Sequence, residues 1–224
     1  AEIIENIEVE EILTKENKVV GVRCGDTSIK GKNIILTGGL WSREIAKQIG
    51  VHLPLYACEH YYVVTEEISD LTPRPVMRDF DKGIYFKEDA GKMLVGWFEK
   101  NAIGCPMSNI SHDFCFDEFP VNMDHIEPYL LASMGTFPMI GEVGIRTFFN
   151  GPESFTNDNL HLMGPTPEIE NFYVACGMNS KGIAAAGGLG KIMADWIIDG
   201  YPSGEITETD VRRNNSVQTS QTYI

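Results

Sequence analysis

The sequence predicts a mixed α+β or α/β chain, in which strand–turn–helix units near both ends flank a central, mainly antiparallel sheet. Two observations carry this prediction. Short apolar runs stop at glycine and continue as helix around Gly38 and Gly177. The middle of the chain instead alternates aromatic and polar residues, as half-exposed antiparallel strands do. With 224 residues and 43% hydrophobic content, the chain can bury one large or two smaller cores.

Composition and charge exclude several classes of protein. Acidic residues outnumber basic ones 32 to 18, and the net charge of −14 opposes binding to nucleic acid or to an anionic membrane surface. No apolar run approaches the roughly 20 residues that span a bilayer. The five cysteines include no C-x-x-C pair, and their odd number favours a reducing compartment. We therefore expect a cytoplasmic location, with the mitochondrial matrix as the alternative.

The first section, residues 1–52, predicts a strand meander followed by a strand, a turn and a helix. Its expected strands are Ile3–Val9, Val19–Cys24 and Ile34–Thr37. Gly38 and Gly39 then permit a close backbone approach or a positive φ angle. Ile45 and Ile49 mark one face of the helix that follows.

The middle section, residues 53–149, predicts a domain built on a large sheet. Its expected strands are Leu55–Thr65, Gly83–Lys87, Met93–Phe98 and Ile145–Phe149. A single helix is expected at Asn122–Met134. Its apolar stripe consists of Ile126, Tyr129, Leu130 and Met134. We interpret this stripe as ordinary core packing, because the spacing is that of a helix face turned to a core.

One cluster in this section has metal-ligating residue types. Its members are Cys105, His112, Asp113 and Cys115. The cluster lies in a polar stretch without a recognised ligand spacing, so we expect loop residues here and no metal site.

The third section, residues 150–204, returns to the pattern of strand, glycine turn and helix. The helix is expected at Lys181–Asp199, where the free N–H groups of its first turn can face an anion or a polarised ring. It contains Gly187, Gly188 and Gly190. Each glycine costs about 1 kcal/mol relative to alanine, so these three indicate a packing or cofactor constraint where the helix packs closest. Residues 205–224 lack periodicity and predict a tail or linker.

Three motifs in this order carry a family resemblance: I-I-L-T-G-G-L-W-S-R-E, then N-G-P-E-S-F-T-N-D with L-M-G after it, then F-Y-V-A-C-G-M-N-S-K-G-I-A-A-A-G-G-L-G. Together they resemble the flavin-dependent amine oxidoreductases of the D-amino-acid-oxidase superfamily, and within it the sarcosine and dimethylglycine dehydrogenase branch. The resemblance covers about residues 1–213. It implies that 1–52 and 150–204 form part of an FAD-binding Rossmann-like domain and that 53–149 form a substrate domain.

The resemblance also implies the function of the parent protein. This would be oxidation of a secondary or tertiary amine, such as sarcosine or dimethylglycine, by hydride transfer to FAD. The implied partners are the small-molecule amine, an electron acceptor or a folate domain in the parent, and a second copy in a homo-oligomer. Neither nucleic acid nor a membrane is expected as a partner.

The resemblance assigns flavin contacts to two glycine turns. The residues are Thr37, Gly38, Gly39 and Leu40 in the first turn, and Gly177, Met178, Asn179, Ser180, Lys181, Gly182 and Ile183 in the second. N–H groups at a helix start stabilise the negative charge that develops on a reduced flavin.

The resemblance also assigns substrate-facing residues. In E-H-Y-Y-V-V-T, His60 matches the family histidine that contacts or deprotonates the amine, and histidine titrates in the range that this role needs. A lone histidine among tyrosines equally suits a structural hydrogen bond. Tyr85 matches a second substrate-facing position, with Phe86 as the alternative match and sheet packing as the simpler role.

The sequence departs from the family pattern at several positions. The dinucleotide fingerprint G-x-G-x-x-G is absent, so the resemblance implies a fragment that binds FAD weakly or not at all and shows no measurable turnover alone. Gly151 stands where some relatives attach flavin through cysteine, and Ala184 where they bind carboxylate through lysine. Asn157 replaces the usual proline. A second reading is a non-catalytic regulatory relative of the pyruvate dehydrogenase phosphatase, which G-W-F-E-K-N-A at Gly96–Ala102 also resembles.

Overall fold

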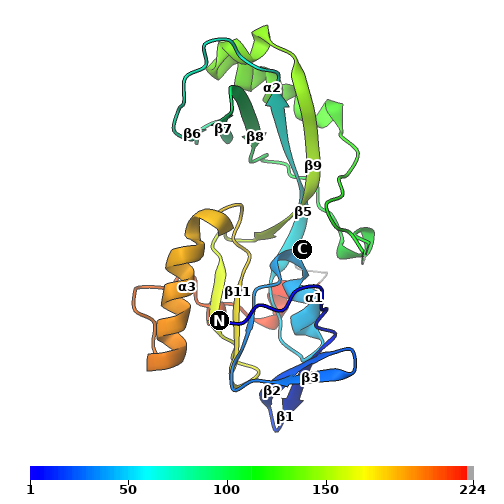
Figure 1. Ribbon diagram of the computed structural model, residues 1–224, viewed down its shortest axis with the longest axis vertical. Helices are drawn as coiled ribbons and strands as arrows, with labels where there is room; N and C mark the ends of the chain where they lie inside the picture. Colours follow the sequence, from blue (N-terminus) through cyan, green and yellow to red (C-terminus); the bar gives the residue numbers. More distant parts are fainter. Residues whose placement is uncertain (112, 221–224) are drawn as a thin grey trace. The chain divides into compact units, whose positions relative to one another are not determined.

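The computed structural model describes residues 1–111 and 113–220, which divide into two units (Figure 1). The first unit comprises Ala1–Tyr56 and Ser154–Ile224, and the second comprises Ala57–Glu153. The divisions fall within two long strands, β5 (Leu55–Thr65) and β9 (Ile145–Thr156), each a few residues beyond the boundary expected from the sequence.

The first unit opens with a three-stranded antiparallel meander. Its strands are β1 (Glu11–Lys15), β2 (Lys18–Cys24) and β3 (Thr27–Lys30). The strand expected at Ile3–Val9 is wrong, because these residues form no strand and Ile3 is 84% exposed. An apolar run forms a strand only where a neighbouring strand satisfies its backbone, and no strand among the described residues pairs with this segment.

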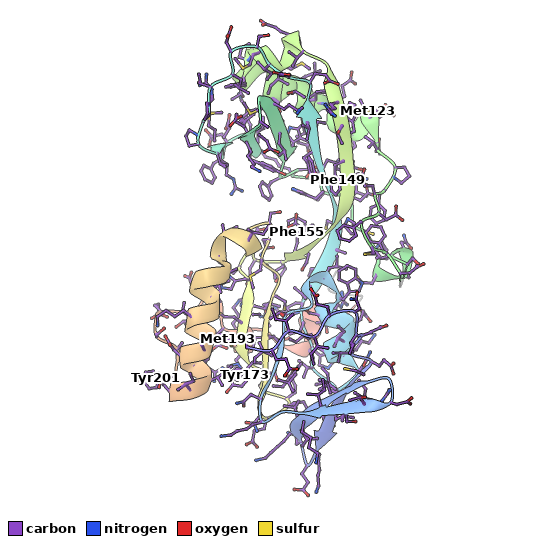
Figure 2. The ribbon with its side chains drawn as sticks, viewed as in Figure 1. Met123, Phe149, Phe155, Tyr173, Met193 and Tyr201 are labelled. Carbon is purple, nitrogen blue, oxygen red and sulfur yellow. The ribbon has the colours of Figure 1, made fainter. Side chains whose placement is uncertain are left out.

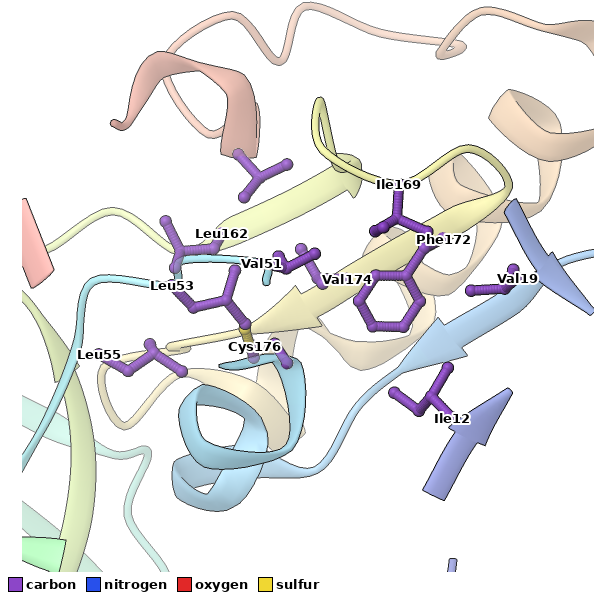
Figure 3. Packing of buried hydrophobic residues seen from close by; sticks show 12 residues of the cluster. Ile12, Val19, Val51, Leu53, Leu55, Leu162, Ile169, Phe172, Val174 and Cys176 are labelled. Carbon is purple, nitrogen blue, oxygen red and sulfur yellow. The ribbon is translucent and has the colours of Figure 1, made fainter. Parts of the chain in front are cut away.

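The second sheet of this unit combines parallel and antiparallel pairing. Its strands are β10 (Leu162–Pro165), β11 (Phe172–Cys176) and β4 (Ile34–Leu36), in that order, with β11 and β4 parallel. Alternation along β11 turns Phe172 and Val174 toward the core that also contains Ala46 of α1 (Ser42–Lys47). Figure 3 shows these β11 side chains gathered with Leu53 in that core.

The opposite face of this sheet is covered by α3 (Gly182–Asp199). Met193 and Trp196 are buried against it, and Figure 2 shows Met193 beside Tyr173 of β11. The glycines expected at the closest contact do not lie there. At Gly187, Gly188 and Gly190, an added Cβ would meet no other part of the described chain within 4 Å. The packing expectation is wrong within this chain, because these positions lie on an open face of the helix, whereas the alternative of a cofactor constraint stays a prediction.

The C-terminal segment is attached to the first unit. Residues 205–220, expected to be a tail or linker, bury Ile206 and Val211 and include η4 (Val211–Arg213). Arg213 forms an ion pair with Asp158 and donates to the backbone oxygens of Leu160 and His161. The sequence shows no periodicity here because ion pairs and backbone contacts, not an amphipathic face, hold the segment. Residues 221–224 lie outside the described residues.

The second unit is a five-stranded antiparallel sheet covered by one helix. The strands lie in the order β6 (Met77–Asp79), β7 (Ile84–Asp89), β8 (Lys92–Trp97), β5 and β9. The helix α2 (Met123–Thr136) places its expected stripe in the core of this unit, which confirms that prediction. Trp97 Nε1 donates to Ser133 Oγ at 2.8 Å, so the buried indole N–H is satisfied.

Several smaller features complete the fold. The remaining 3-10 helices are η1 (Gly39–Trp41), η2 (Met107–Asn109), η3 (Pro138–Glu142) and η5 (Ser216–Thr219). Among the helices of the described residues, none has the length and apolar character needed to cross a bilayer.

Candidate functional site

The second unit brings His60 and Tyr85 together. Alternation along β5 turns Tyr61 and Val63 into the core beneath α2, so His60 lies on the other face of the sheet. Ile84 and Phe86 likewise enter the core, which leaves Tyr85 on the face of His60. The His60 Nε2 and the Tyr85 hydroxyl lie 3.1 Å apart, and the two ring planes differ by 7°. The sequence-predicted pair is therefore a hydrogen-bonded pair.

A glycine on the strand between them makes this contact possible. Gly96 of β8 is in register with Tyr85 on one side and with Tyr62 on the other. A Cβ at Gly96 would lie 2.1 Å from the Tyr85 hydroxyl oxygen, so only glycine lets the tyrosine ring cross the strand toward His60. The sequence contains a signal for this contact, because a glycine inside a strand often marks the close approach of another group. The residues expected at the site nevertheless did not include Gly96.

A carboxylate completes the group. Glu153 of β9 places Oε2 3.8 Å from His60 Nε2. Burial lowers the pKa of His60, and the nearby Glu153 charge opposes that shift to a smaller extent. Burial also raises the pKa of Tyr85, with Glu153 adding to the effect. At neutral pH the site therefore combines a neutral imidazole with a protonated phenol, a pair able to accept or relay a proton.

Aromatic rings surround these polar groups. The Phe98 ring is tilted against both His60 and Tyr85, with centroid distances of 5.3 and 5.6 Å. On the same face, Tyr62 and Phe149 stack at 4.4 Å. Exposed aromatic faces attract methylated ammonium groups through their π electrons, so this surface suits an N-methylated amine.

The first unit holds the predicted glycine turn after β11. Gly177 adopts a φ of +65°, and an added Cβ would lie 2.7 Å from Leu55 and 2.8 Å from Thr156. Asn179 is 5% exposed; its Oδ1 accepts from the Thr156 backbone N–H at 2.9 Å and its Nδ2 donates to the Gly177 oxygen at 2.7 Å. The Asn179 side chain therefore braces the turn from within, while the backbone of the turn is what can meet a ligand.

The turn leads into the start of α3. The N-cap residue of α3 is Lys181, whose side chain makes no cap hydrogen bond. Ile183 is fully exposed one residue into the helix. N–H groups at the start of an 18-residue helix carry partial positive charge and fit an electron-rich ring edge or an anion.

An apolar groove of about 580 Å³ runs beside this helix start. Its lining combines Thr37, which follows β4, with Met178 and Gly182 at the second turn. Further lining residues are Ile35, Ala175, Ala186, Leu189, Gly190, Met193, Ala194 and Ile197. The groove thus unites three of the residues predicted to contact flavin. The lining does not include Gly38, Gly39, Leu40, Gly177, Asn179, Ser180, Lys181 or Ile183.

The donors and the shape of this region fit part of a flavin. An apolar groove beside N–H groups at a helix start matches a planar ring that accepts electrons and carries negative charge when it is reduced. The pyrophosphate-binding fingerprint that would complete such a site is absent from the sequence.

A second cavity, of about 420 Å³, lies in the second unit on the core side of β5. Its lining includes the carboxylate of Glu59, which accepts from Asn150 Nδ2 at 2.7 Å and from the Tyr61 hydroxyl. Nearby, burial raises the pKa of Glu99 to about 7, with the charge of Glu59 contributing. Cys105 also lines this cavity. Within the described part of the chain, no three His, Cys, Asp or Glu side chains are placed to hold a metal, and His112 lies outside that part.

Comparison with known proteins decides the family. A family model described as DAO, FAD dependent oxidoreductase, matches residues 1–196. The chain belongs to this FAD-dependent oxidoreductase family. Among solved structures, it resembles L-proline dehydrogenase from P. horikoshii, with a TM-score of 0.79 and 21% identity over 94% of this chain and 54% of that one. Glycine oxidase from Geobacillus kaustophilus gives a TM-score of 0.72 and 19% identity over 95% and 53%. These likenesses confirm the predicted fold class.

Three sequence relatives match nearly the whole chain, and two of them are amine oxidoreductases. The chain is 38% identical over 224 residues to 4-methylaminobutanoate oxidase (formaldehyde-forming) of Paenarthrobacter nicotinovorans, covering 100% of the chain and 27% of that protein. It is 32% identical to mitochondrial sarcosine dehydrogenase of Mus musculus, covering 99% and 24%. The mouse pyruvate dehydrogenase phosphatase regulatory subunit is 31% identical, covering 100% and 26%. The chain spans about a quarter of the length of these relatives.

Proposed function

We propose that the chain is part of a flavin-dependent oxidoreductase that oxidises a secondary or tertiary N-methylated amine, with sarcosine and dimethylglycine as the first substrates to test. The observation that supports it most is the His60–Tyr85 pair, backed by Glu153 and set in an aromatic face. Relatives named as sarcosine dehydrogenase and 4-methylaminobutanoate oxidase support the same reaction class.

The roles proposed for His60, the aromatic face and FAD follow from the chemistry of amines. An N-methylated amine is a cation at neutral pH, whereas loss of hydride from the neighbouring carbon requires the neutral amine. His60, held neutral by burial, accepts the ammonium proton, and the aromatic face holds the methyl groups. FAD supplies the hydride acceptor when it is bound. The amine thereby becomes an iminium ion, which water hydrolyses.

The first unit would hold the flavin ring in this proposal. The backbone of the turn from Gly177 to Ile183 and the start of α3 would face the ring edge, with Thr37 on the other side of the groove. Gly38, Gly39 and Leu40 would shape the first turn, and Asn179 would keep the second turn rigid. Thus the side chains of the second unit handle the proton, and the backbone of the first unit stabilises charge.

A regulatory role without catalysis is less well supported than amine oxidation. The regulatory relative is 31% identical, compared with 38% for the oxidase, and it matches the same stretch of chain. An absorbance spectrum of the full-length protein that contains this chain separates the two. A flavin band in the folded protein supports the oxidoreductase, and its absence from a folded protein would contradict it. The isolated chain, which lacks the fingerprint, should purify without stoichiometric flavin.

The remaining partners stay proposals for the parent protein: an electron acceptor, a folate domain and a second copy of the chain. A reducing compartment suits the five cysteines, all of which are free. The cytoplasm remains the first expectation, and the mitochondrial matrix, where the sarcosine dehydrogenase relative is named, the alternative.

A further inference from the structure

Glu153 occupies a position that the expected site did not include. It lies on β9 in the N-G-P-E-S-F segment, on the strand that neighbours β5. Its carboxylate is 3.8 Å from His60 Nε2, and the side chain is 29% exposed, compared with 10% for His60. A carboxylate so near a buried imidazole acts through a medium of low effective dielectric constant, where its charge is weakly screened.

The groups that face His60 from the surrounding strands differ in kind. Tyr85 on β7 places its hydroxyl 3.1 Å from Nε2. Arg78 on β6 stacks its guanidinium 4.4 Å over Phe98, the ring between it and the imidazole. Glu99, which follows β8, acts on Tyr85, and so does Tyr62 of β5. Glu153 makes an ion-pair contact with His60 itself.

The proposed reaction creates a positive charge on the buried imidazole of His60. Proton transfer breaks the ammonium N–H bond and forms an N–H bond at His60 Nε2, with no change in electron count. In the His60 tautomer whose Nε2 carries no proton, the Tyr85 hydroxyl donates to Nε2, and after protonation it can turn and accept from Nε2–H. The imidazolium that results is buried, and an unpaired buried charge is costly. A carboxylate at 3.8 Å offsets that cost.

We propose that Glu153 is a positioning and charge-balancing residue, which stabilises the protonated form of His60 after that residue has taken the proton of the amine. This role rests on the proposed amine oxidation. It also makes the site favour cationic substrates, because the carboxylate attracts the ammonium ion before the proton moves.

The first test measures His60 directly in the 224-residue chain and needs neither flavin nor turnover. NMR titration of the imidazole compares wild type with Glu153→Gln, which keeps the size of the side chain and removes its charge. The His60 pKa should fall by about one unit, a tenfold loss of proton affinity at that ring, since an adjacent charge shifts a pKa by one unit or more. His161, in the other unit, should titrate unchanged and serves as the internal reference.

Two further variants test whether the change in the His60 pKa comes from the charge of Glu153 itself. Glu142→Gln, at an exposed position of η3, makes the same change in net charge and should leave the His60 titration unaltered. Glu153→Asp keeps the charge farther from the ring and should give a smaller fall than Glu153→Gln. An unchanged His60 pKa in a folded Glu153→Gln chain would overturn the proposal. If Glu153→Gln does not fold, an unchanged pKa in Glu153→Asp would do so.

The second test uses the flavin-loaded full-length protein. In Glu153→Gln the acidic limb of the kcat/KM profile should move to lower pH, following the lower pKa of the base, while the plateau rate falls. A residue with a merely structural role would lower the rate without moving the limb. Turnover that survives His60→Ala would contradict the function proposed for His60, yet the NMR result for Glu153 would stand, so the two failures are distinguishable.

Discussion

The two units present their candidate functional groups in different ways. In the second unit, three neighbouring strands place Tyr85, Gly96 and Tyr62 in one register, and His60 lies on the same face two residues before Tyr62. In the first unit the candidate groups are backbone N–H groups and an open helix face, where Ile183 is fully exposed. The difference shows that the proposed proton-handling side chains are brought together within the second unit, whereas the flavin contacts proposed for the first unit are backbone groups.

Among the substitutions that compare the two units, Gly96→Ala should have the largest effect. The added methyl group would overlap the Tyr85 ring, so the tyrosine must move away from His60. In the flavin-loaded full-length protein, kcat/KM should fall about 100-fold, as displacements of about 1 Å at a reacting group do.

Gly104→Ala is the matched control for this variant. Gly104 is also in the second unit, and an added Cβ there meets nothing within 4 Å, so turnover should be unchanged. Equal activity in Gly96→Ala and Gly104→Ala would show that the Tyr85–His60 contact has no part in catalysis.

Asn179→Ala tests the brace in the first unit. The substitution leaves the buried Thr156 N–H and the Gly177 oxygen without their partner, which should lower the free energy of unfolding by about 1–3 kcal/mol. Urea denaturation of the chain measures this loss, with Asn101→Ala at an exposed turn as the control. A loss no greater than that of the control would mean that the turn is held by its backbone alone.

A third test uses pH to probe the carboxyl group of Glu99 in the second unit. Burial raises the pKa of Glu99 from its ordinary 4.5 to about 7. The folded state therefore keeps a proton that the unfolded state loses, so stability should decline as the pH rises from about 4.5 to 7. Thermal unfolding across this range should show the decline in wild type and a weaker one in Glu99→Gln. Identical pH profiles would contradict the assignment to Glu99.

The smallest expected effect is an increase in stability. Gly187→Ala on the open face of α3 should stabilise the isolated chain by about 1 kcal/mol, because alanine favours a helix and the added Cβ meets no neighbour. Denaturant unfolding measures the change. A destabilised variant would show that this face is already packed in the isolated chain, and the contrast between the two units would weaken.

Much of the fold could be predicted because local patterns carry it. Strand β5 begins and ends as expected at Leu55 and Thr65, and α3 begins one residue later than expected. The strand expected at Ile3–Val9 fails because apolar content does not provide a pairing partner. His60 and Tyr85 came from the family resemblance, whereas Glu153 and Gly96 depend on cross-strand register. Register arises from the pairing of distant segments, which one sequence does not display.

Flavin reduction under anaerobic conditions in the full-length protein tests most directly whether His60 takes part in amine oxidation. Mixing with sarcosine or dimethylglycine should bleach the flavin band, and His60→Ala should slow the bleaching by about 100-fold or more, as expected when a general base is lost. A folded, flavin-loaded protein that no N-methylated amine bleaches, or that bleaches equally fast in His60→Ala, would contradict the claim that this chain supplies the amine-handling half of the enzyme.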